Sequence, residues 1–244
     1  MSENSENTWR VVETIPESHD TTSVVIQGPV ERVKNRRPGQ FATIRVMGEN
    51  GWSEAHPFTI SAAPESETLR FTIKNVGDFT ATVRDWKPGT EIQCSGPMGA
   101  FCKDIEEQTD IVCIAGGVGI TPFLSVLRHF REIKAPNRVT LFWANKTLAD
   151  AFAREELAAM AAELPLRVVH LLSRETPPAA TRPNEFFEQG RFSGELLPRH
   201  VPDVNAAFYL CGPPAMKETV LKELAGCGVD LSRVQKENFT GAKK

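Results

Sequence analysis

Residues 111–122 read Ile-Val-Cys-Ile-Ala-Gly-Gly-Val-Gly-Ile-Thr-Pro, and this stretch decides the fold of the chain. Its apolar half predicts a buried strand, its glycines predict a sharp turn, and Pro122 suits the first turn of a helix that we expect to run to Ile133. Glycines let a backbone approach a ligand closely, and a helix N-terminus offers N–H groups to a pyrophosphate. The stretch therefore favours dinucleotide binding, although Pro122 stands where the usual Gly-x-Gly-x-x-Gly pattern has its last glycine. The alternative is a tight strand-to-helix turn that binds nothing.

Downstream of this stretch, apolar runs of strand length alternate with helical patterns. We expect strands at 139–144, 166–173 and 207–211, helices near 149–163 and 214–225, and a long loop over the proline-rich, polar residues 175–190. Strands that alternate with helices imply parallel strands joined by crossover helices. The sequence therefore predicts an α/β domain with a doubly wound parallel sheet, which we assign to residues 105–244.

Upstream of residue 105 the rhythm is different. Apolar and polar residues alternate over 41–46 and again over 69–74, which is the period of strands with one buried face. Segments 22–27 and 90–95 add β-branched runs bounded by Gly-Pro and Pro-Gly turns. Several short strands with turns between them predict a small antiparallel barrel or sandwich over residues 8–104.

A single helix is expected to interrupt these strands. Phe79, Val83 and Trp86 recur at helical spacing, and we take Asp78 as the N-cap of this helix. The motif Gly77-Asp78-Phe79-Thr80 thus places a glycine and a hydroxyl at a helix N-terminus, which makes it a second candidate anion site. The alternative is a capped helix that binds no ligand.

Two other motifs place reactive or flat groups beside strands. In His56-Pro57-Phe58-Thr59 an aromatic ring and a hydroxyl could stack on a flat ring and hydrogen-bond its edge, although a phenylalanine is more often a core residue. In Tyr209-Leu210-Cys211-Gly212-Pro213-Pro214 the cysteine falls at the carboxyl end of an expected strand, where open α/β sheets bind ligands. The alternative for Cys211 is a small buried residue.

Composition narrows the classes of function. A chain of 244 residues is long enough for two domains, and a net charge of −3 argues against a general nucleic-acid binder. No apolar run is long enough to span a bilayer, and the first residues lack the apolar core of a signal peptide. Five cysteines without a Cys-x-x-Cys pair argue against a disulfide scaffold, a zinc site and a cysteine-bound cluster. This use of cysteine fits a reducing compartment, so we expect a cytoplasmic protein. The histidines also lack metal-binding spacing, so we expect no metal site.

Seven motifs follow one another in the order of a known family. They are PGQF (38–41), HPFT (56–59), GDFT (77–80), GPMGAF (96–101), AGGVGITP (115–122), CGPP (211–214) and KENF (236–239). In this order they resemble the ferredoxin–NADP reductase superfamily over nearly the whole chain. Their spelling is most similar to the dehydrogenase portion of ferric reductases and NADPH oxidases. The resemblance implies an FAD-binding Greek-key β-barrel followed by an NAD(P)-binding domain, and an NAD(P)H-dependent FAD oxidoreductase.

The resemblance also implies which residues hold FAD. The family's Arg-x-Tyr-Ser motif, which contacts the pyrophosphate, stacks on the flavin and approaches its reactive nitrogen, has His56, Phe58 and Thr59 at the corresponding positions here. Phe239 would cover the other face of the flavin. The implied FAD-binding set is His56, Pro57, Phe58, Thr59, Ile73, Lys74, Gly77, Asp78, Phe79, Thr80 and Phe239.

For the pyridine nucleotide the resemblance implies contacts around the glycine stretch and the later CGPP motif. That set is Gly116, Gly117, Val118, Gly119, Thr121, Pro122, Cys211, Gly212 and Pro213. NADPH-preferring relatives place a serine and an arginine on the 2′-phosphate, so Ser173 and Arg174 favour NADP over NAD. Thr59, Cys211 and Glu237 are the implied catalytic residues. Hydride transfer needs positioning more than acid–base work, so we interpret Cys211 and Glu237 as positioning and electrostatic groups.

The sequence therefore predicts transfer of electrons from NAD(P)H through FAD to a separate acceptor. Candidate acceptors are a ferredoxin-like or flavodoxin-like carrier, an oxygenase component and a ferric chelate. Two other hypotheses stay open: a non-catalytic or electron-transfer subunit of a larger redox complex, and a flavin reductase that releases reduced flavin. The basic cluster of Arg32, Lys34, Arg36 and Arg37 is interpreted as a solvated turn, with a docking patch for an acidic carrier as the alternative.

Overall fold

The computed structural model describes residues 8–49 and 51–237, and these divide into two compact units. The first unit contains the described residues up to Ala100 together with Thr121–His129, and the second contains Phe101–Ile120 and the described residues from Phe130 onward. The predicted boundary after residue 104 lies close to the division after Ala100. The return of Thr121–His129 to the first unit has no counterpart in the sequence prediction.

The first unit is an antiparallel barrel. Its strands are β1 (Thr8–Ser18), β2 (Thr21–Gln27), β3 (Phe41–Gly48), β4 (Gly51–Trp52), β5 (His56–Thr59), β6 (Leu69–Lys74) and β7 (Glu91–Met98). Their order is β4-β3-β7-β1-β2-β6, and β5 pairs with β3. An isolated bridge between Ile60 and Phe71 joins the end of β5 to β6, so the sheet closes on itself. This confirms the expected antiparallel architecture.

The alternation predicted for β6 holds for its apolar residues and fails at one polar position. Leu69, Phe71 and Ile73 are buried in the barrel core, as expected for one face of a strand. Thr72, which the alternation places on the exposed face, is also buried. Its hydroxyl contacts Ser23 Oγ at 2.8 Å and Ser61 Oγ at 3.2 Å, so neighbouring hydroxyl groups compensate for the loss of water.

Helix α1 (Asp78–Thr82) forms where the motif GDFT predicts it, but its cap differs from the prediction. The N-cap is Gly77, and Asp78 is the first helical residue. The hydroxyl of Thr80 accepts hydrogen bonds from the backbone N–H groups of Val76 and Gly77, both at 2.9 Å. The Thr80 hydroxyl, three residues into the helix, therefore fixes the loop. The carboxylate of Asp78 is not needed as a cap, and in the first turn it interacts favourably with the positive end of the helix dipole. A 3₁₀ turn (Val83–Asp85) continues from the helix.

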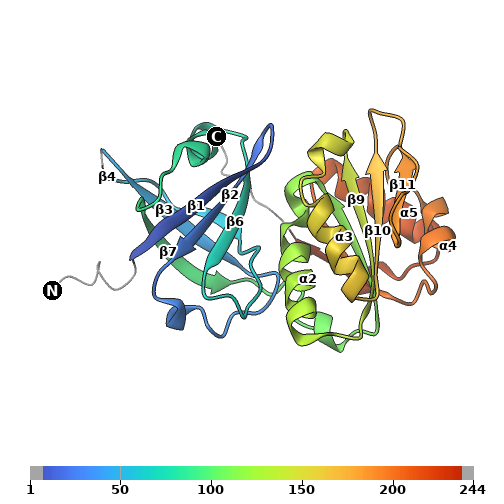
Figure 1. Cartoon of the computed structure of the whole chain (residues 1–244). Helices are drawn as coiled ribbons and strands as arrows, with labels where there is room; N and C mark the ends of the chain where they lie inside the picture. The colour runs from blue at the N-terminus through green and yellow to red at the C-terminus, as the bar shows by residue number, and fades with distance from the viewer. Residues whose placement is uncertain (1–7, 50, 238–244) are drawn as a thin grey trace. The chain divides into compact units, whose positions relative to one another are not determined.

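The second unit is a parallel sheet with helices on both faces (Figure 1). The strands are β8 (Asp110–Gly116), β9 (Arg138–Asn145), β10 (Leu166–Leu172), β11 (Glu185–Gln189), β12 (Ala207–Cys211) and β13 (Val234–Glu237), in the order β11-β10-β9-β8-β12-β13. The helices of this unit are α3 (Arg154–Glu163), α4 (Leu197–His200) and α5 (Pro214–Gly226), and helix α2 (Thr121–Ile133) belongs to it only from Phe130 onward. The strand order reverses between β8 and β12, and ligands of doubly wound sheets bind at such a switch point.

Two elements of this sheet were not expected. The long loop predicted over residues 175–190 is wrong, because Glu185–Gln189 forms strand β11, parallel to β10. Long-range partners account for it: the carboxylate of Glu185 is buried and receives two hydrogen bonds from Arg154 on α3, at 2.7 and 3.0 Å. The second unexpected element is β13, which pairs with β12 over residues 234–237.

Helix α3 begins later than predicted. The helix expected near residue 149 starts at Arg154, because Asp150 instead accepts hydrogen bonds from the backbone and hydroxyl of Thr147, both at 2.9 Å, and closes a 3₁₀ turn.

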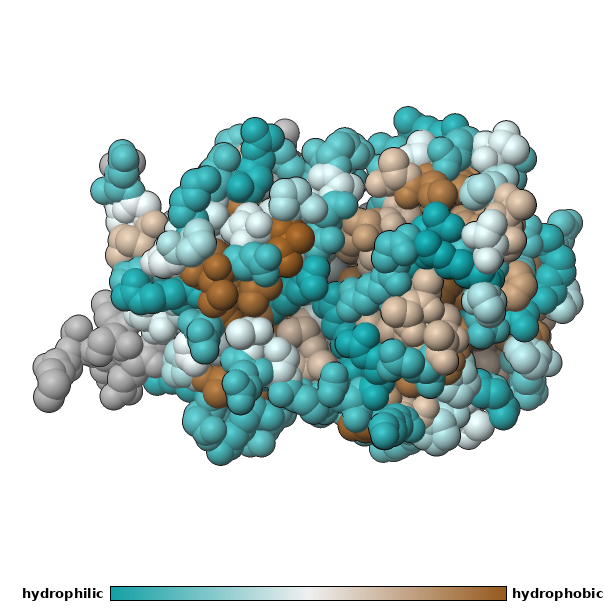
Figure 2. Space-filling model, in the orientation of Figure 1, coloured by the Kyte–Doolittle hydropathy of each residue, from teal (hydrophilic) through white to brown (hydrophobic). Residues whose placement is uncertain are grey.

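On the face drawn in Figure 2, apolar residues come to the surface in patches separated by polar ones. Within the described part of the chain, no helix has the length and apolar character needed to span a bilayer.

Candidate functional site

In the barrel, strand β5 carries the motif HPFT along the edge of β3. Phe58 pairs with Ala42 and Thr59 pairs with Phe41. Thr59 is buried and Phe58 is half-buried, so the pairing holds the hydroxyl inside the barrel rim while part of the aromatic ring remains accessible. Strand β5 is short and lies beside the bridge that closes the barrel, so its neighbours hold it firmly. Such a strand suits side chains that must keep a fixed position.

The motifs HPFT and GDFT meet in space through their aromatic rings. His56 stacks on Phe79 with ring centroids 3.8 Å apart and an interplanar angle of 24°. Phe58 lies nearly parallel to Phe79, with centroids 6.1 Å apart and an angle of 16°. Trp86 meets Phe79 edge-on at 5.8 Å. The rings of His56, Phe58 and Phe79 therefore form a near-parallel aromatic stack, in which His56 lies against the face of Phe79.

The loop before α1 is held in shape by Thr80. The hydroxyl of Thr80 holds the N–H groups of Val76 and Gly77, so the loop keeps its shape without a ligand. A Cβ added at Gly77 would meet no atom within 4 Å, so open space adjoins the backbone there. The first N–H groups of a helix have no partner inside the helix, and they are ready donors to a phosphate.

Two residues of the predicted FAD set have side chains committed to the barrel itself. Ile73 belongs to the core and is 2% exposed, so only its backbone could meet a ligand. The Lys74 ammonium forms an ion pair with Asp20 at 2.7 Å. Phe239 lies outside the described residues.

In the second unit, the glycines of residues 116–119 serve two different purposes. A Cβ at Gly119 would lie 2.4 Å from the carbonyl oxygen of Cys211, and one at Gly116 would lie 2.4 Å from Met216 Sδ. These two glycines are therefore required by close packing between the loops that follow β8 and β12. Gly117 differs, because its φ is +52° and a Cβ there would meet nothing within 4 Å. Gly117 is thus the position where the loop borders open space.

The indole of Trp143 forms a hydrogen bond to this glycine loop, a contact that the sequence analysis did not predict. Trp143 is fully buried on β9, and its Nε1 donates to the carbonyl oxygen of Gly117 at 2.9 Å. Because the carbonyl of a peptide and the following N–H point in opposite directions, anchoring the Gly117 carbonyl also orients the Val118 N–H. Nothing in the local sequence pattern distinguishes this tryptophan from an ordinary core residue.

Cys211 and Glu237 are brought together at the carboxyl ends of neighbouring strands. They are partners in the parallel register of β12 and β13. Burial, with the charge of Glu237 adding to it, raises the pKa of the Cys211 thiol far above its usual value, although Lys217 acts in the opposite sense. Cys211 is therefore a neutral thiol, which fits a positioning group and excludes a resting thiolate nucleophile.

The ends of β9 and β10 carry a polar cluster that includes both predicted specificity residues. The backbone N–H of Ser173 donates to Asn145 O at 3.1 Å, and that of Arg174 donates to Lys146 O at 2.8 Å. Arg174 and Lys146 are exposed, so two cationic side chains leave adjacent loops. The amide nitrogen of Asn145 is buried and has no hydrogen-bond partner in the described part of the chain. Asn145 and Lys146 were not singled out from the sequence.

The basic cluster near residue 36 is not a uniformly solvated turn. Arg36 is 4% exposed, and its guanidinium donates to the carbonyl oxygens of Ala63 and Ser66 at 2.8 and 2.7 Å. The predictions of a solvated turn and of a docking patch are therefore both wrong for Arg36, because its charge serves buried loop carbonyls. Arg32, Lys34 and Arg37 are exposed. Among residues 8–49 and 51–237, no group of His, Cys, Asp and Glu side chains has the arrangement of a metal site.

Comparison with known families agrees with this geometry. A model described as an FAD-binding domain matches residues 7–100, and a model described as an oxidoreductase NAD-binding domain matches residues 113–222. The first match contains both motifs of the aromatic stack, and the second contains the glycine loop, Ser173, Arg174 and Cys211. The division of the chain between two cofactor-binding domains is thus shown by sequence as well as by fold.

Curated relatives include reductase components of oxygenases. The reductase component of propane 2-monooxygenase from Mycolicibacterium smegmatis is 28% identical over 235 residues, covering 92% of this chain and 65% of that protein. The ferredoxin–NAD(P)+ reductase component of a naphthalene 1,2-dioxygenase system from Pseudomonas putida is 25% identical over 232 residues, covering 89% of this chain and 68% of that protein. The chain thus spans about two thirds of the length of these relatives.

Solved structures share the two-unit architecture. The FAD/NAD-binding domain of nitric oxide dioxygenase from Vibrio cholerae has a TM-score of 0.81 at 25% identity, covering 96% of this chain and 98% of that one. A ferredoxin–NADP+ reductase from Neisseria gonorrhoeae with bound FAD and NADP has a TM-score of 0.78 at 19% identity, covering 95% and 97%, and shows the likeness of fold.

Proposed function

This chain belongs to the ferredoxin–NADP reductase family, and from that premise we propose that it takes a hydride from NADPH or NADH onto bound FAD and passes the electrons to a separate acceptor. The observation that supports the proposal best is that each unit carries one half of the required binding apparatus. The barrel offers a stack of aromatic rings beside a helix start that Thr80 holds in place, and the parallel sheet offers a glycine loop at its topological switch point.

The residues of the barrel fit FAD. The near-parallel rings of Phe58 and Phe79 suit a planar ring system, and the backbone around Gly77 suits a diphosphate. His56 lies flat against Phe79, so we assign it a stacking and hydrogen-bonding role in place of the family's arginine. Bound FAD supplies the two-electron chemistry, so the chain's own residues bind it, orient it and exclude water. We assign the buried Thr59 hydroxyl to the edge of the flavin.

The residues of the parallel sheet fit a pyridine nucleotide. We assign the diphosphate to the loop around Gly117, where open space adjoins a backbone held in place by Trp143. We assign Cys211 and Glu237 to the nicotinamide end, where a neutral thiol and a neighbouring carboxylate orient the ring without exchanging protons with it.

We further propose that NADPH is preferred over NADH. A 2′-phosphate is a dianion at neutral pH, and Arg174 and Lys146 are two exposed cations on loops joined by a backbone hydrogen bond. The hydroxyl of Ser173 lies beside them and donates to Asn145 O at 3.3 Å. The nearest acid in sequence, Glu175, accepts a hydrogen bond from the backbone N–H of Leu148 at 2.6 Å.

The names of the relatives support an oxygenase component or a ferredoxin-like carrier as the acceptor. We propose a cytoplasmic location, which suits a chain whose five cysteines are all free thiols. The test is purification of the full chain, measurement of its FAD content, and steady-state turnover with NADPH against oxygenase components, ferredoxins and ferric chelates. The proposal predicts FAD retained in near-stoichiometric amount and rapid reduction of at least one of these acceptors. A chain that retains no flavin, or that turns over only with free flavin, would contradict it.

A further inference from the structure

One face of helix α2 is hydrogen-bonded to the barrel segment that directly follows β5. Three contacts make the attachment: Ser125 Oγ donates to Ala62 O (2.8 Å), Arg128 Nη1 donates to Ser61 O (2.6 Å), and His129 Nδ1 meets Glu65 Oε1 (2.7 Å). The three helix residues are spaced i, i+3 and i+4, so they share one side of the helix. All six residues belong to the first unit.

Arg128 is the charged member of this attachment, and it is 7% exposed. Burying a guanidinium is costly unless its N–H groups find acceptors, so such residues are rarely incidental. The acceptor here is a backbone carbonyl, which must find a donor when it is removed from water. A second buried arginine, Arg36, binds the carbonyls of Ala63 and Ser66. Two buried guanidinium groups thus fix a single segment of six residues, 61–66.

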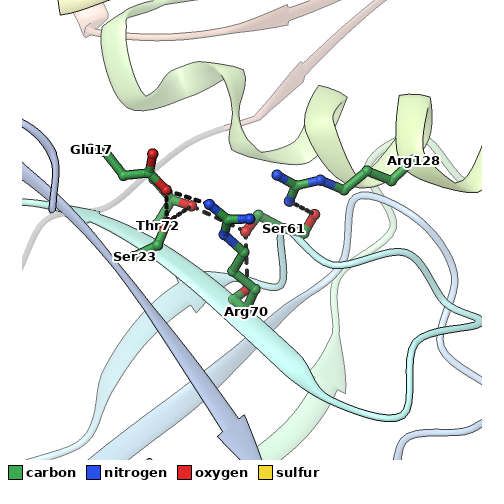
Figure 3. A network of polar contacts seen from close by, with 6 residues as sticks. All are labelled: Glu17, Ser23, Ser61, Arg70, Thr72 and Arg128. Atoms are coloured by element: carbon green, nitrogen blue, oxygen red, sulfur yellow. Dashed lines mark hydrogen bonds and ion pairs between the residues drawn. The ribbon is translucent and has the colours of Figure 1, made fainter. Parts of the chain in front are cut away.

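The same segment is tied to the barrel wall on its other side (Figure 3). Ser61 Oγ donates to the carbonyl oxygen of Arg70 at 3.1 Å and contacts Thr72 Oγ1 at 3.2 Å. Thr72 in turn contacts Ser23, whose hydroxyl donates to Glu17 together with the Arg70 guanidinium. In Figure 3 Arg128 approaches Ser61 from α2, whereas the Arg70 guanidinium points toward Glu17. Ser61 is therefore the point at which the helix and the wall network meet.

This attachment lies between Thr59, which the proposed function assigns to the flavin, and Thr121, which the family resemblance implies for the pyridine nucleotide. Thr59 is two residues before Ser61, and the intervening Ile60 is fixed by its N–H to Gln40 O at 2.9 Å. Thr121 begins the same helix that carries Arg128, two turns earlier. A rigid path of one helix, one guanidinium and three residues of backbone therefore joins Thr121 to Thr59.

We propose that Arg128 is a positioning residue for hydride transfer: through Ser61 it fixes Thr59 relative to the start of helix α2. The inference rests on the proposed function, which places the flavin edge at Thr59 and the nucleotide diphosphate at the loop around Gly117, directly before Thr121. Arg128 touches neither cofactor in this account. Because transfer rates depend steeply on how the two reactants are held, loss of the contact slows the transfer step more than it weakens either cofactor's binding.

The test compares Arg128→Met and Arg128→Lys with Arg70→Met in the FAD-loaded full chain. Arg70→Met is the matched control, because it removes a guanidinium from the same network without touching α2. The measurements are thermal stability, FAD content, nucleotide affinity and the limiting rate of flavin reduction in anaerobic stopped flow. We expect Arg128→Met to reduce the limiting rate by about tenfold or more, with affinities changed by less than about twofold. Arg128→Lys recovers most of the rate, and Arg70→Met stays within about twofold of wild type even where it unfolds earlier.

A limiting rate in Arg128→Met equal to that of Arg70→Met would overturn the assignment, as would a loss wholly explained by missing FAD. If Arg128→Met does not fold, Ser125→Ala carries the test, because it removes a second contact on the same helix face without burying a charge. It is expected to slow reduction by about threefold, and an unchanged rate overturns the assignment. A wild-type holoprotein that neither nucleotide reduces would refute the proposed function itself, whereas a reducible wild type with an unaffected Arg128→Met refutes only the role of Arg128.

Discussion

Cys211 and Glu237 are register partners on β12 and β13, so a thiol and a carboxylate lie side by side where two parallel strands end. Their proximity adds to burial in raising the pKa of the thiol. A carboxylate next to a thiol that stays protonated at neutral pH provides fixed polarity without a reactive nucleophile. This pairing is suited to holding a ring in place, which is the role proposed for it.

The first prediction follows from the neutral state of Cys211. At neutral pH the holoprotein should keep its activity during prolonged treatment with iodoacetamide, because a buried, protonated thiol is not alkylated. Cys227, which is partly exposed, should be the first thiol modified in a mass-spectrometric time course. Rapid inactivation that coincides with labelling of Cys211 would show that a thiolate is present and would contradict the assignment.

A second prediction concerns alkaline stability. Burial raises the pKa of Cys94 from 9.0 to about 12. Above pH 9 the unfolded chain releases this proton while the folded chain keeps it, so the folded state binds more protons and stability falls as pH rises. At about pH 10 the loss from this one group is about 1 kcal/mol.

Urea unfolding of wild type and Cys94→Ala at about pH 8 and about pH 10 measures this difference. The variant is less stable at both pH values, since it leaves a small cavity, but its stability should fall less between them. Equal falls in the two proteins would show that the Cys94 thiol ionises in the folded state.

The third prediction concerns Trp143. Trp143→Phe keeps an aromatic ring in the core but removes the donor to the Gly117 carbonyl. A buried hydrogen bond contributes about 1 kcal/mol, so the affinity for NADP+ should fall by about fivefold. Isothermal titration measures the affinity, and FAD content is the internal control, because the barrel is untouched. Unchanged nucleotide affinity in the folded variant would mean that the loop holds its shape without the indole.

The two kinds of glycine in the loop give a fourth prediction. Gly119→Ala forces a Cβ to within 2.4 Å of the Cys211 carbonyl, so the packing between the two loops must shift and the melting temperature should drop. Gly117→Ala meets no atom and costs only the left-handed backbone, about 1–2 kcal/mol. It should fold and bind nucleotide more weakly. Differential scanning calorimetry and nucleotide titration on both variants check this, and the reverse ranking of melting temperatures would contradict the packing argument.

A fifth prediction tests nucleotide preference. Arg174→Ala should lower kcat/KM for NADPH by at least about tenfold, and Lys146→Ala by about fivefold, because each removes a charge-assisted contact to the 2′-phosphate. Values for NADH should stay nearly constant in both variants. Lys222→Ala, which removes an exposed cation on α5, is the control for net charge. Equal losses with the two nucleotides would remove both residues from 2′-phosphate recognition.

Much of the fold follows from patterns confined to single elements. The apolar run before Gly116, the glycines and the helix to Ile133 appear as predicted because strand burial, turn geometry and helix start are local properties. Cys211 ends β12 as expected for the same reason. Strand β11 could not be found in this way, since its two phenylalanines are flanked by polar residues and its order depends on Arg154 from another element.

The candidate site shows the same division. HPFT and GDFT could be identified from residue type and spacing, because a family motif records what a cofactor needs. Arg36, Trp143 and Arg128 could not, because each acts on a backbone carbonyl that the fold alone brings within reach. A buried arginine and a solvated one look alike in a sequence, and the acceptor of Arg128 lies 67 residues away.

The central claim is that hydride passes from a reduced pyridine nucleotide to FAD held by this chain. Anaerobic stopped flow on the FAD-loaded protein, with NADPH carrying either hydrogen or deuterium at the transferred position, tests it directly. The account predicts rapid loss of the oxidised flavin absorbance and a slower loss with deuterium. Flavin that keeps its absorbance with both NADPH and NADH would contradict it.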